Sequence, residues 1–211
     1  MKIFSIDSPL YRFMQRLWDV FRLNLLWLLC CLPVVTIGCS TLAAFTVTMH
    51  MADDTEGDIP KDFFKAFKAN FKQGIVMTFL TLIPVYAVYL DFHIYSQIEG
   101  GSLPVLIMGI FSAYFVSFAL IYAYPLLARY DNTIANSLKN SFRIGMKYFF
   151  RTVLVIAIVA VELFIILWNT TTLLVGALIG PACVFYTISG TARYIFGEIE
   201  KQPGSVSNRD E

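Results

Sequence analysis

Long runs of apolar residues alternate with short, polar and basic segments along most of the chain. Four of these runs carry few or no charges: Gly74 to Tyr95, Leu103 to Leu127, Val153 to Trp168 and Thr172 to Ile195. Each is close to the ~20 residues that a helix needs to cross the ~30 Å hydrocarbon core of a bilayer. None alternates apolar and polar residues as the strands of a membrane barrel do. The pattern therefore predicts an all-α membrane protein with four full transmembrane helices.

The first apolar run, Leu23 to Met49, is uncharged and long, but Pro33 and Gly38 interrupt it. It could cross the membrane once as a kinked span with an external N-terminus. It could instead turn back at Pro33–Gly38, with two arms that reach only ~24 Å each at ~1.5 Å per residue. We expect the hairpin, and the two alternatives together give five to six membrane segments. Its broken backbone would have to be packed inside protein. Gly180 and Pro181 form a second candidate helix break in the last run.

The sixteen Lys and Arg residues fall into four patches, and two other loops, 92–102 and 169–171, carry none. The patches are Lys2/Arg12/Arg16/Arg22, Lys61/Lys65/Lys68/Lys72, Arg129/Lys139/Arg143/Lys147/Arg151 and Arg193/Lys201/Arg209. Lys and Arg accumulate on the cytoplasmic side of a bilayer. The distribution predicts a multi-pass protein of the cell membrane with both termini in the cytoplasm. Only the hairpin places all four patches on that side.

Two of the basic segments are also amphipathic, and each leads directly into an apolar run. In segment 60–72, Phe side chains share one arc of a helix and Lys side chains the next, and segment 134–151 repeats the arrangement. Such helices either lie in the headgroup layer of the bilayer or dock onto a partner protein. The candidate docking residues are Phe63, Phe64, Phe67, Phe71, Lys65, Lys68, Leu138, Phe142 and Arg143. Residues 8–19 are a further candidate surface helix.

A few ionisable residues lie within or beside the apolar runs, where such groups are expensive and are functional candidates by default. Glu162 lies inside the fourth run, and Asp91 lies near the predicted outer end of the second. Arg129 and Asp131 mark the predicted cytoplasmic end of the third, where we expect Arg129 to pair with Asp131 or with a helix C-terminus. A single carboxylate such as Glu162 could be a proton or cation site, or a hydrogen-bonded structural group.

Composition agrees with a membrane protein and gives no sign of catalysis. Hydrophobic residues make up 57% of the chain and charged residues 15%, against roughly a quarter charged in soluble domains. The net charge is only +1, and the basic residues are spread over the flanks of the apolar runs, so the sequence does not indicate a nucleic-acid partner. The four cysteines lack the spacing of a metal site, and no nucleotide-binding or hydrolase motif occurs. We expect no metal, no cofactor and no enzymatic activity. We expect residues 1–200 to form one membrane domain and residues 201–211 to form a flexible polar tail.

Three segments resemble the YesL-like membrane proteins, a family without an assigned activity. They are NLLWLLCCLPVVTIGCSTLAAFTVT (24–48), KDFFKAFKANFKQG (61–74) and PLLARYDNTIANSLKNS (125–141). The family usually has Pro-Ala after the glycine of the first segment, whereas this chain has Cys39-Ser40. Members occur in Gram-positive bacteria, commonly beside genes for ABC importers of oligosaccharides. The resemblance implies a role in carbohydrate uptake and supplies no catalytic residues.

Two functions from different classes follow from these features. The first is a non-enzymatic accessory protein that associates with permease subunits of a carbohydrate ABC importer within the lipid bilayer. It relies on the resemblance and on the two Phe/Lys helices. The alternative is a small-solute channel or transporter that uses the broken helices and Glu162, because unwound helices build transporter sites. The sequence does not predict an oligomeric state.

Overall fold

The computed structural model describes residues 9–55, 57–98 and 102–201, and all the regular structure in them is helical. The predicted tail at 201–211 lies outside these residues except for Lys201. The elements are α1 (Pro9–Cys30), the 3-10 turn η1 (Val34–Thr36), α2 (Ile37–Ala52), α3 (Ile59–Ala69), α4 (Phe71–Gln97), α5 (Leu103–Leu120), α6 (Ala123–Arg129), α7 (Ile134–Lys147), α8 (Phe149–Leu167) and α9 (Thr170–Glu200). The all-α prediction is confirmed for the part of the chain that the structure describes.

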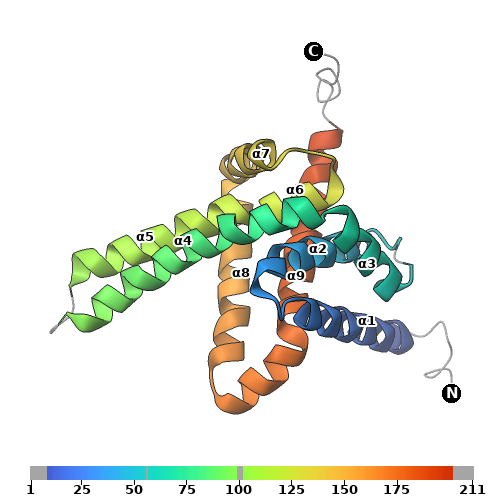
Figure 1. Cartoon of the computed structure of the whole chain (residues 1–211), viewed down its shortest axis with the longest axis horizontal. Coiled ribbons are helices and arrows are strands. Elements are labelled where there is room, and N and C mark those ends of the chain that lie inside the picture. Colours follow the sequence, from blue (N-terminus) through green and yellow to red (C-terminus); the bar gives the residue numbers. More distant parts are fainter. Residues whose placement is uncertain (1–8, 56, 99–101, 202–211) are drawn as a thin grey trace.

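Two long helical hairpins give the molecule its shape. Helices α4 and α5 form one and α8 and α9 the other, and the two splay apart from a common end, with α1 and α2 beside that end (Figure 1). Each of the four runs predicted to cross a membrane lies in one of these hairpins, with α5 and α6 together forming the third span, Leu103–Arg129. Val34–Ala52 is the fifth segment that is long and apolar enough to cross. The protein is therefore a multi-span membrane protein.

The first apolar run turns back on itself. Helix α1 ends at Cys30, η1 follows, and α2 returns along the direction from which α1 came (Figure 1). Arg16 in α1 donates a 2.7 Å hydrogen bond to the carbonyl oxygen of Met51 and pairs with Asp54, so the two ends of the hairpin lie together. The sixteen residues of α2 span ~24 Å at 1.5 Å per residue. The expected reversal of the first apolar run is therefore present as a helical hairpin of α1 and α2.

The start of α4 secures the turn of this hairpin. The hydroxyl of Thr78 accepts a 2.8 Å hydrogen bond from the amide of Gly38 and lies 3.0 Å from the carbonyl oxygen of Val35. The two helices approach at a pair of glycines. A Cβ atom added to Gly74 would lie 2.5 Å from Cys39 Cα, and one added to Gly38 would lie 2.7 Å from Thr78 N. The backbone freed at the turn is thus bonded to a neighbouring span, as membrane depth requires.

Helix α9 runs through Gly180 and Pro181 without a break, so the prediction of a helix break there is wrong. Proline has no amide hydrogen, so the carbonyl oxygen of Ala177 loses its usual donor. The side-chain amide of Asn24, fully buried in α1, donates a 2.8 Å hydrogen bond to that carbonyl. Its oxygen accepts a 3.1 Å bond from the amide of Ala182. Asn24 thereby satisfies the backbone around the proline, and the helix continues.

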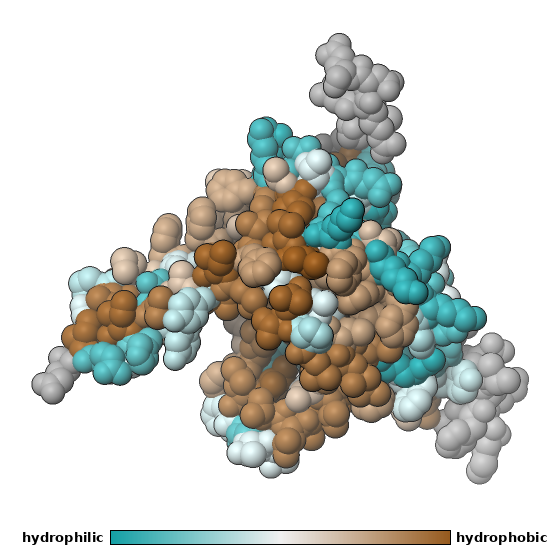
Figure 2. Space-filling model, in the orientation of Figure 1, coloured by the Kyte–Doolittle hydropathy of each residue, from teal (hydrophilic) through white to brown (hydrophobic). Residues whose placement is uncertain are grey.

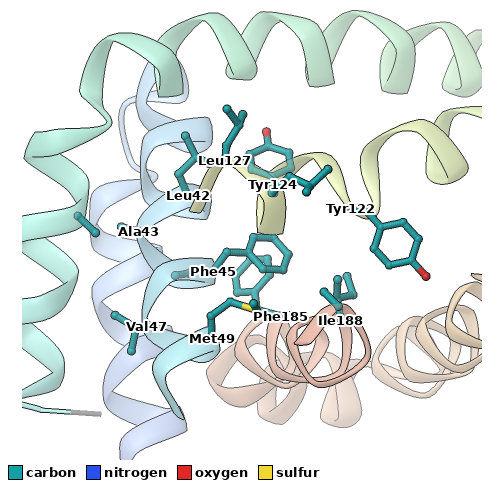
Figure 3. Packing of buried hydrophobic residues seen from close by; sticks show 14 of the residues in the cluster. Leu42, Ala43, Phe45, Val47, Met49, Tyr122, Tyr124, Leu127, Phe185 and Ile188 are labelled. Atoms are coloured by element: carbon teal, nitrogen blue, oxygen red, sulfur yellow. The ribbon is translucent and has the colours of Figure 1, made fainter. Parts of the chain in front are cut away.

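The hydrophobic core is centred on α2. Nearly every residue of this helix is buried, and Phe45 packs its ring against Tyr124 of α6 and Phe185 of α9, with ring centroids 5.9 and 5.1 Å apart (Figure 3). Leu42 and Ile188 belong to the same cluster. The hairpins, in contrast, leave many large apolar side chains exposed, as the hydrophobic surface of Figure 2 shows. Because α2 is enclosed by the other helices, it can be shorter than a lipid-facing span.

Basic residues from all four patches gather at the common end of the hairpins. We call this region the basic end. It consists of α3, α7, the segment between α6 and α7, and the last turns of α9. Asp53, just after α2, lies 3.3 Å from Arg129 and 2.6 Å from Arg193. Arg16 and Arg22 of α1 reach Asp54 and Asp58 in the same region. Hydrophilic surface covers this part of the molecule in Figure 2. The hairpin thus brings the first basic patch to the same end as the other three.

Candidate functional site

Helix α3 is the first of the two predicted amphipathic helices, and it ends earlier than expected. It covers Ile59–Ala69, and Phe71 already belongs to α4. Phe63 is fully buried and Phe67 packs partly against the core, because α3 lies against α1 and α2. Phe63 as a docking residue is therefore a wrong prediction. Phe64 and Phe71 are exposed. Periodicity found the apolar face correctly, but it could not show that the protein itself covers half of that face.

The second amphipathic helix, α7, covers Ile134–Lys147, and α8 begins at Phe149 inside the predicted segment. Leu138 packs partly against the core. Phe142 is exposed, although its ring also touches Phe118 of α5, with ring centroids 5.7 Å apart. Arg143 is exposed as well. Like α3, this helix uses part of its apolar face for internal packing and leaves one aromatic ring and its basic residues outside.

A polar cavity of about 780 Å³ lies at the basic end, between the α3–α4 junction and the segment that joins α6 to α7. Gln73 bridges its two walls by donating a 3.3 Å hydrogen bond to the carbonyl oxygen of Asn132. Lys68 and Lys72 line one wall and Asp131 the other. Sequence reasoning missed this cavity. Its only signal was the group of amide side chains, Asn70, Gln73 and Asn132, placed beside the two amphipathic segments.

The sequence predicts that Arg129 pairs with Asp131 or with a helix C-terminus. In the structure Arg129 instead forms ion pairs with two other carboxylates at the basic end. It lies 3.3 Å from Asp53 and 3.4 Å from Glu200. The hydroxyl of Tyr130 donates a hydrogen bond to the same Glu200. Burial and that hydrogen bond raise the pKa of Tyr130 above its ordinary value, so this tyrosine stays neutral and remains a donor. These contacts hold the ends of α2, α6 and α9 together, so the role of the cluster is structural.

Glu162 lies inside α8, where it faces α9. Its Oε1 accepts a 2.8 Å hydrogen bond from the hydroxyl of Thr187, while Oε2 is buried and has no hydrogen-bond partner among the described residues. The carboxyl group thus ties α8 to α9 through a single hydrogen bond. Asp91 lies in the other hairpin, near the C-terminal end of α4. The structure does not bring the predicted polar candidates together.

An apolar cavity of about 350 Å³ lies between the two hairpins and does not include Glu162 in its lining. Its polar edge is a 2.7 Å hydrogen bond between Thr81 and the hydroxyl of Tyr124. Within residues 9–55, 57–98 and 102–201, no three His, Cys, Asp or Glu side chains group as a metal site requires.

Comparison with known proteins identifies one family. Residues 20–92 match the family described as "Protein of unknown function, DUF624". The matching segment runs from α1 into α4, so it contains most of the α1–α2 hairpin, α3, the Gly38–Gly74 contact and one wall of the polar cavity. The chain matches no curated protein and no solved structure.

Proposed function

We propose that this multi-span membrane protein, whose residues 20–92 match the DUF624 family, is a non-enzymatic accessory protein that binds other membrane proteins through its basic end. One observation carries the proposal. Phe64 of α3 and Phe142 of α7 remain exposed, although each helix also buries an apolar side chain, Phe63 in α3 and Ile144 in α7. Exposed aromatic rings beside basic side chains are typical anchors of protein interfaces.

The charges around these rings support the same conclusion. Lys65 and Lys68 on α3 and Arg143 on α7 have no ion pair in the described part of the chain. The surface can therefore attract an acidic segment of a partner without first breaking an internal pair. The orientation that places this surface in the cytoplasm follows from the charge rule, so we propose a contact with the cytoplasmic side of the partner.

We further propose that the partner is the permease subunit of a carbohydrate ABC importer. The support is the resemblance of residues 24–48, 61–74 and 125–141 to the YesL-like proteins, whose genes commonly lie beside such importers. No part of the basic end resembles a catalytic site, so a binding role is the simpler interpretation. A tagged copy should then recover permease subunits from membranes dissolved in mild detergent.

A triple variant tests the surface itself. Phe64→Asp combined with Lys65→Glu and Lys68→Glu should reduce permease recovery at least tenfold, which corresponds to a loss of ~1.4 kcal/mol in binding. The matched control, Phe64→Tyr with Lys65→Arg and Lys68→Arg, keeps the ring and the charges and should recover permease normally. Equal recovery by both variants, or no transporter component with the unmodified protein while the importer is expressed, would count against the proposal.

A further inference from the structure

We propose that the polar cavity at the basic end binds the headgroup of an anionic phospholipid, whose acyl chains lie along the exposed face of α4. The cavity, of about 780 Å³, has room for a phosphate-bearing headgroup. This site adjoins the partner surface of α3 and α7, and Lys68 belongs to both, whereas Lys72 belongs only to the cavity. The inference does not depend on the proposed partner.

The charge of the cavity suits an anion. Lys68 and Lys72 line it, and Asp131 is the only acidic residue on its walls. Neither lysine has an ion pair among residues 9–55, 57–98 and 102–201, whereas Lys61 and Arg129 are paired with nearby carboxylates. Two positive charges therefore face one negative charge. A phosphate group would neutralise the excess, and basic pockets of this kind on the cytoplasmic side are typical lipid headgroup sites.

The cavity wall also offers unused backbone donors. Helix α4 begins there, and its N-cap residue Asn70 makes no capping hydrogen bond with its side chain. The amides of Phe71 and Lys72 have no acceptor in the described part of the chain. Backbone amides at the first turn of a helix favour negative charge. They supplement the lysines in this cavity.

The face of α4 that continues from Lys72 distinguishes a lipid from a soluble anion. Val76, Phe79 and Ile83 follow at four, seven and eleven residues, which keeps them on the same side of the helix. Their side chains are 47%, 52% and 67% exposed. At ~1.5 Å per residue, Lys72 to Ile83 covers ~16 Å, about the hydrocarbon depth of one leaflet. A headgroup at the cavity would thus place its chains on an apolar track of matching length.

Binding of defined lipids to the full-length protein in mild detergent tests the proposal. We expect phosphatidylglycerol to raise the thermal unfolding temperature in a saturable way, and phosphatidylcholine with the same chains to have little effect. Inorganic phosphate at the same concentration should also have little effect, because it lacks the chains. High salt should weaken the phosphatidylglycerol effect, since exposed charges are screened within ~3 Å at 1 M.

Matched lysine variants identify the site. Lys68→Gln with Lys72→Gln should raise the apparent dissociation constant for phosphatidylglycerol at least tenfold, while the same positions changed to Arg should retain binding. Lys139→Gln, at an exposed lysine of α7 away from the cavity, should behave as the unmodified protein does. These lysines are exposed, so the core is unaffected. The proposal is overturned if both phospholipids bind alike, if phosphate alone reproduces the effect, or if the double Gln variant binds normally.

Discussion

Replacing Gly74 with valine should prevent the protein from folding. A Cβ atom at this position would lie 2.5 Å from Cys39 Cα and 2.7 Å from Cys39 N, and both neighbours are backbone atoms that cannot turn aside. Relief would require α4 to move away from α2, which would break the Gly38–Thr78 hydrogen bond. Overpacking of a core by extra methylene groups already costs ~1–3 kcal/mol, and displacement of a packed helix costs more. The result should be loss of the monodisperse species in size-exclusion chromatography.

Gly190→Val is the matched control for this prediction. It makes the same substitution within a helix, at a position where an added Cβ atom meets no other atom within 4 Å. It should therefore express and unfold as the original protein does. If Gly74→Val behaves like Gly190→Val, then α2 and α4 do not cross at the glycine pair, and the described anchoring of the re-entrant hairpin is wrong.

Replacing Asn24 with alanine should lower the free energy of unfolding by ~2–5 kcal/mol, because it removes two hydrogen bonds to the backbone of α9 and leaves a cavity in place of a fully buried side chain. The bonds are those to the carbonyl of Ala177 and from the amide of Ala182. The thermal unfolding temperature in detergent reports the loss. A large decrease is expected even though Asn24 lies more than 150 residues from its partners in the chain.

Pro181→Ala separates this role of Asn24 from simple loss of packing. It restores an amide at position 181, which can donate to the carbonyl of Ala177 as in an ordinary helix. In this background Asn24→Ala should cost ~1–2 kcal/mol less than it does in the original protein, as a double-mutant cycle would show. If the two costs are equal, Asn24 does not compensate for the proline.

The limits of sequence reasoning in this chain have a physical cause. The apolar runs predicted the four long spans, and charge placement predicted the gathering of basic residues at one end. Apolarity cannot distinguish a face that meets lipid from one that meets protein, because both surroundings are apolar. For this reason Phe63 looked like a surface anchor and is in fact in the core.

The two prolines at predicted helix breaks show a second limit of prediction from the sequence. Pro33 and Pro181 follow the same local rule, and both were predicted to interrupt helices. The chain reverses at Pro33, where the hydroxyl of Thr78 accepts a hydrogen bond from the amide of Gly38. It continues through Pro181, where Asn24 bonds to the backbone on both sides. The outcome depends on side chains 40 residues or more away in the sequence, so no local pattern could have decided it.

The central claim is that the first apolar run enters and returns, so that the whole basic end faces the cytoplasm. Accessibility of single cysteines to an impermeant thiol reagent on intact cells tests it most directly. The probes are placed one at a time at Ser5, Ser102 and Ser207, in a background in which the native cysteines are replaced by alanine. These native residues are Cys30, Cys31, Cys39 and Cys183.

Only the cysteine at position 102, between α4 and α5, should be labelled on intact cells, while all three should be labelled once the membrane is opened. That pattern follows if both termini are cytoplasmic and the 98–102 loop, which carries no basic residue, is outside. Labelling at position 5 on intact cells would mean that the first run crosses the membrane once. The re-entrant hairpin and the shared basic end would then both have to be abandoned.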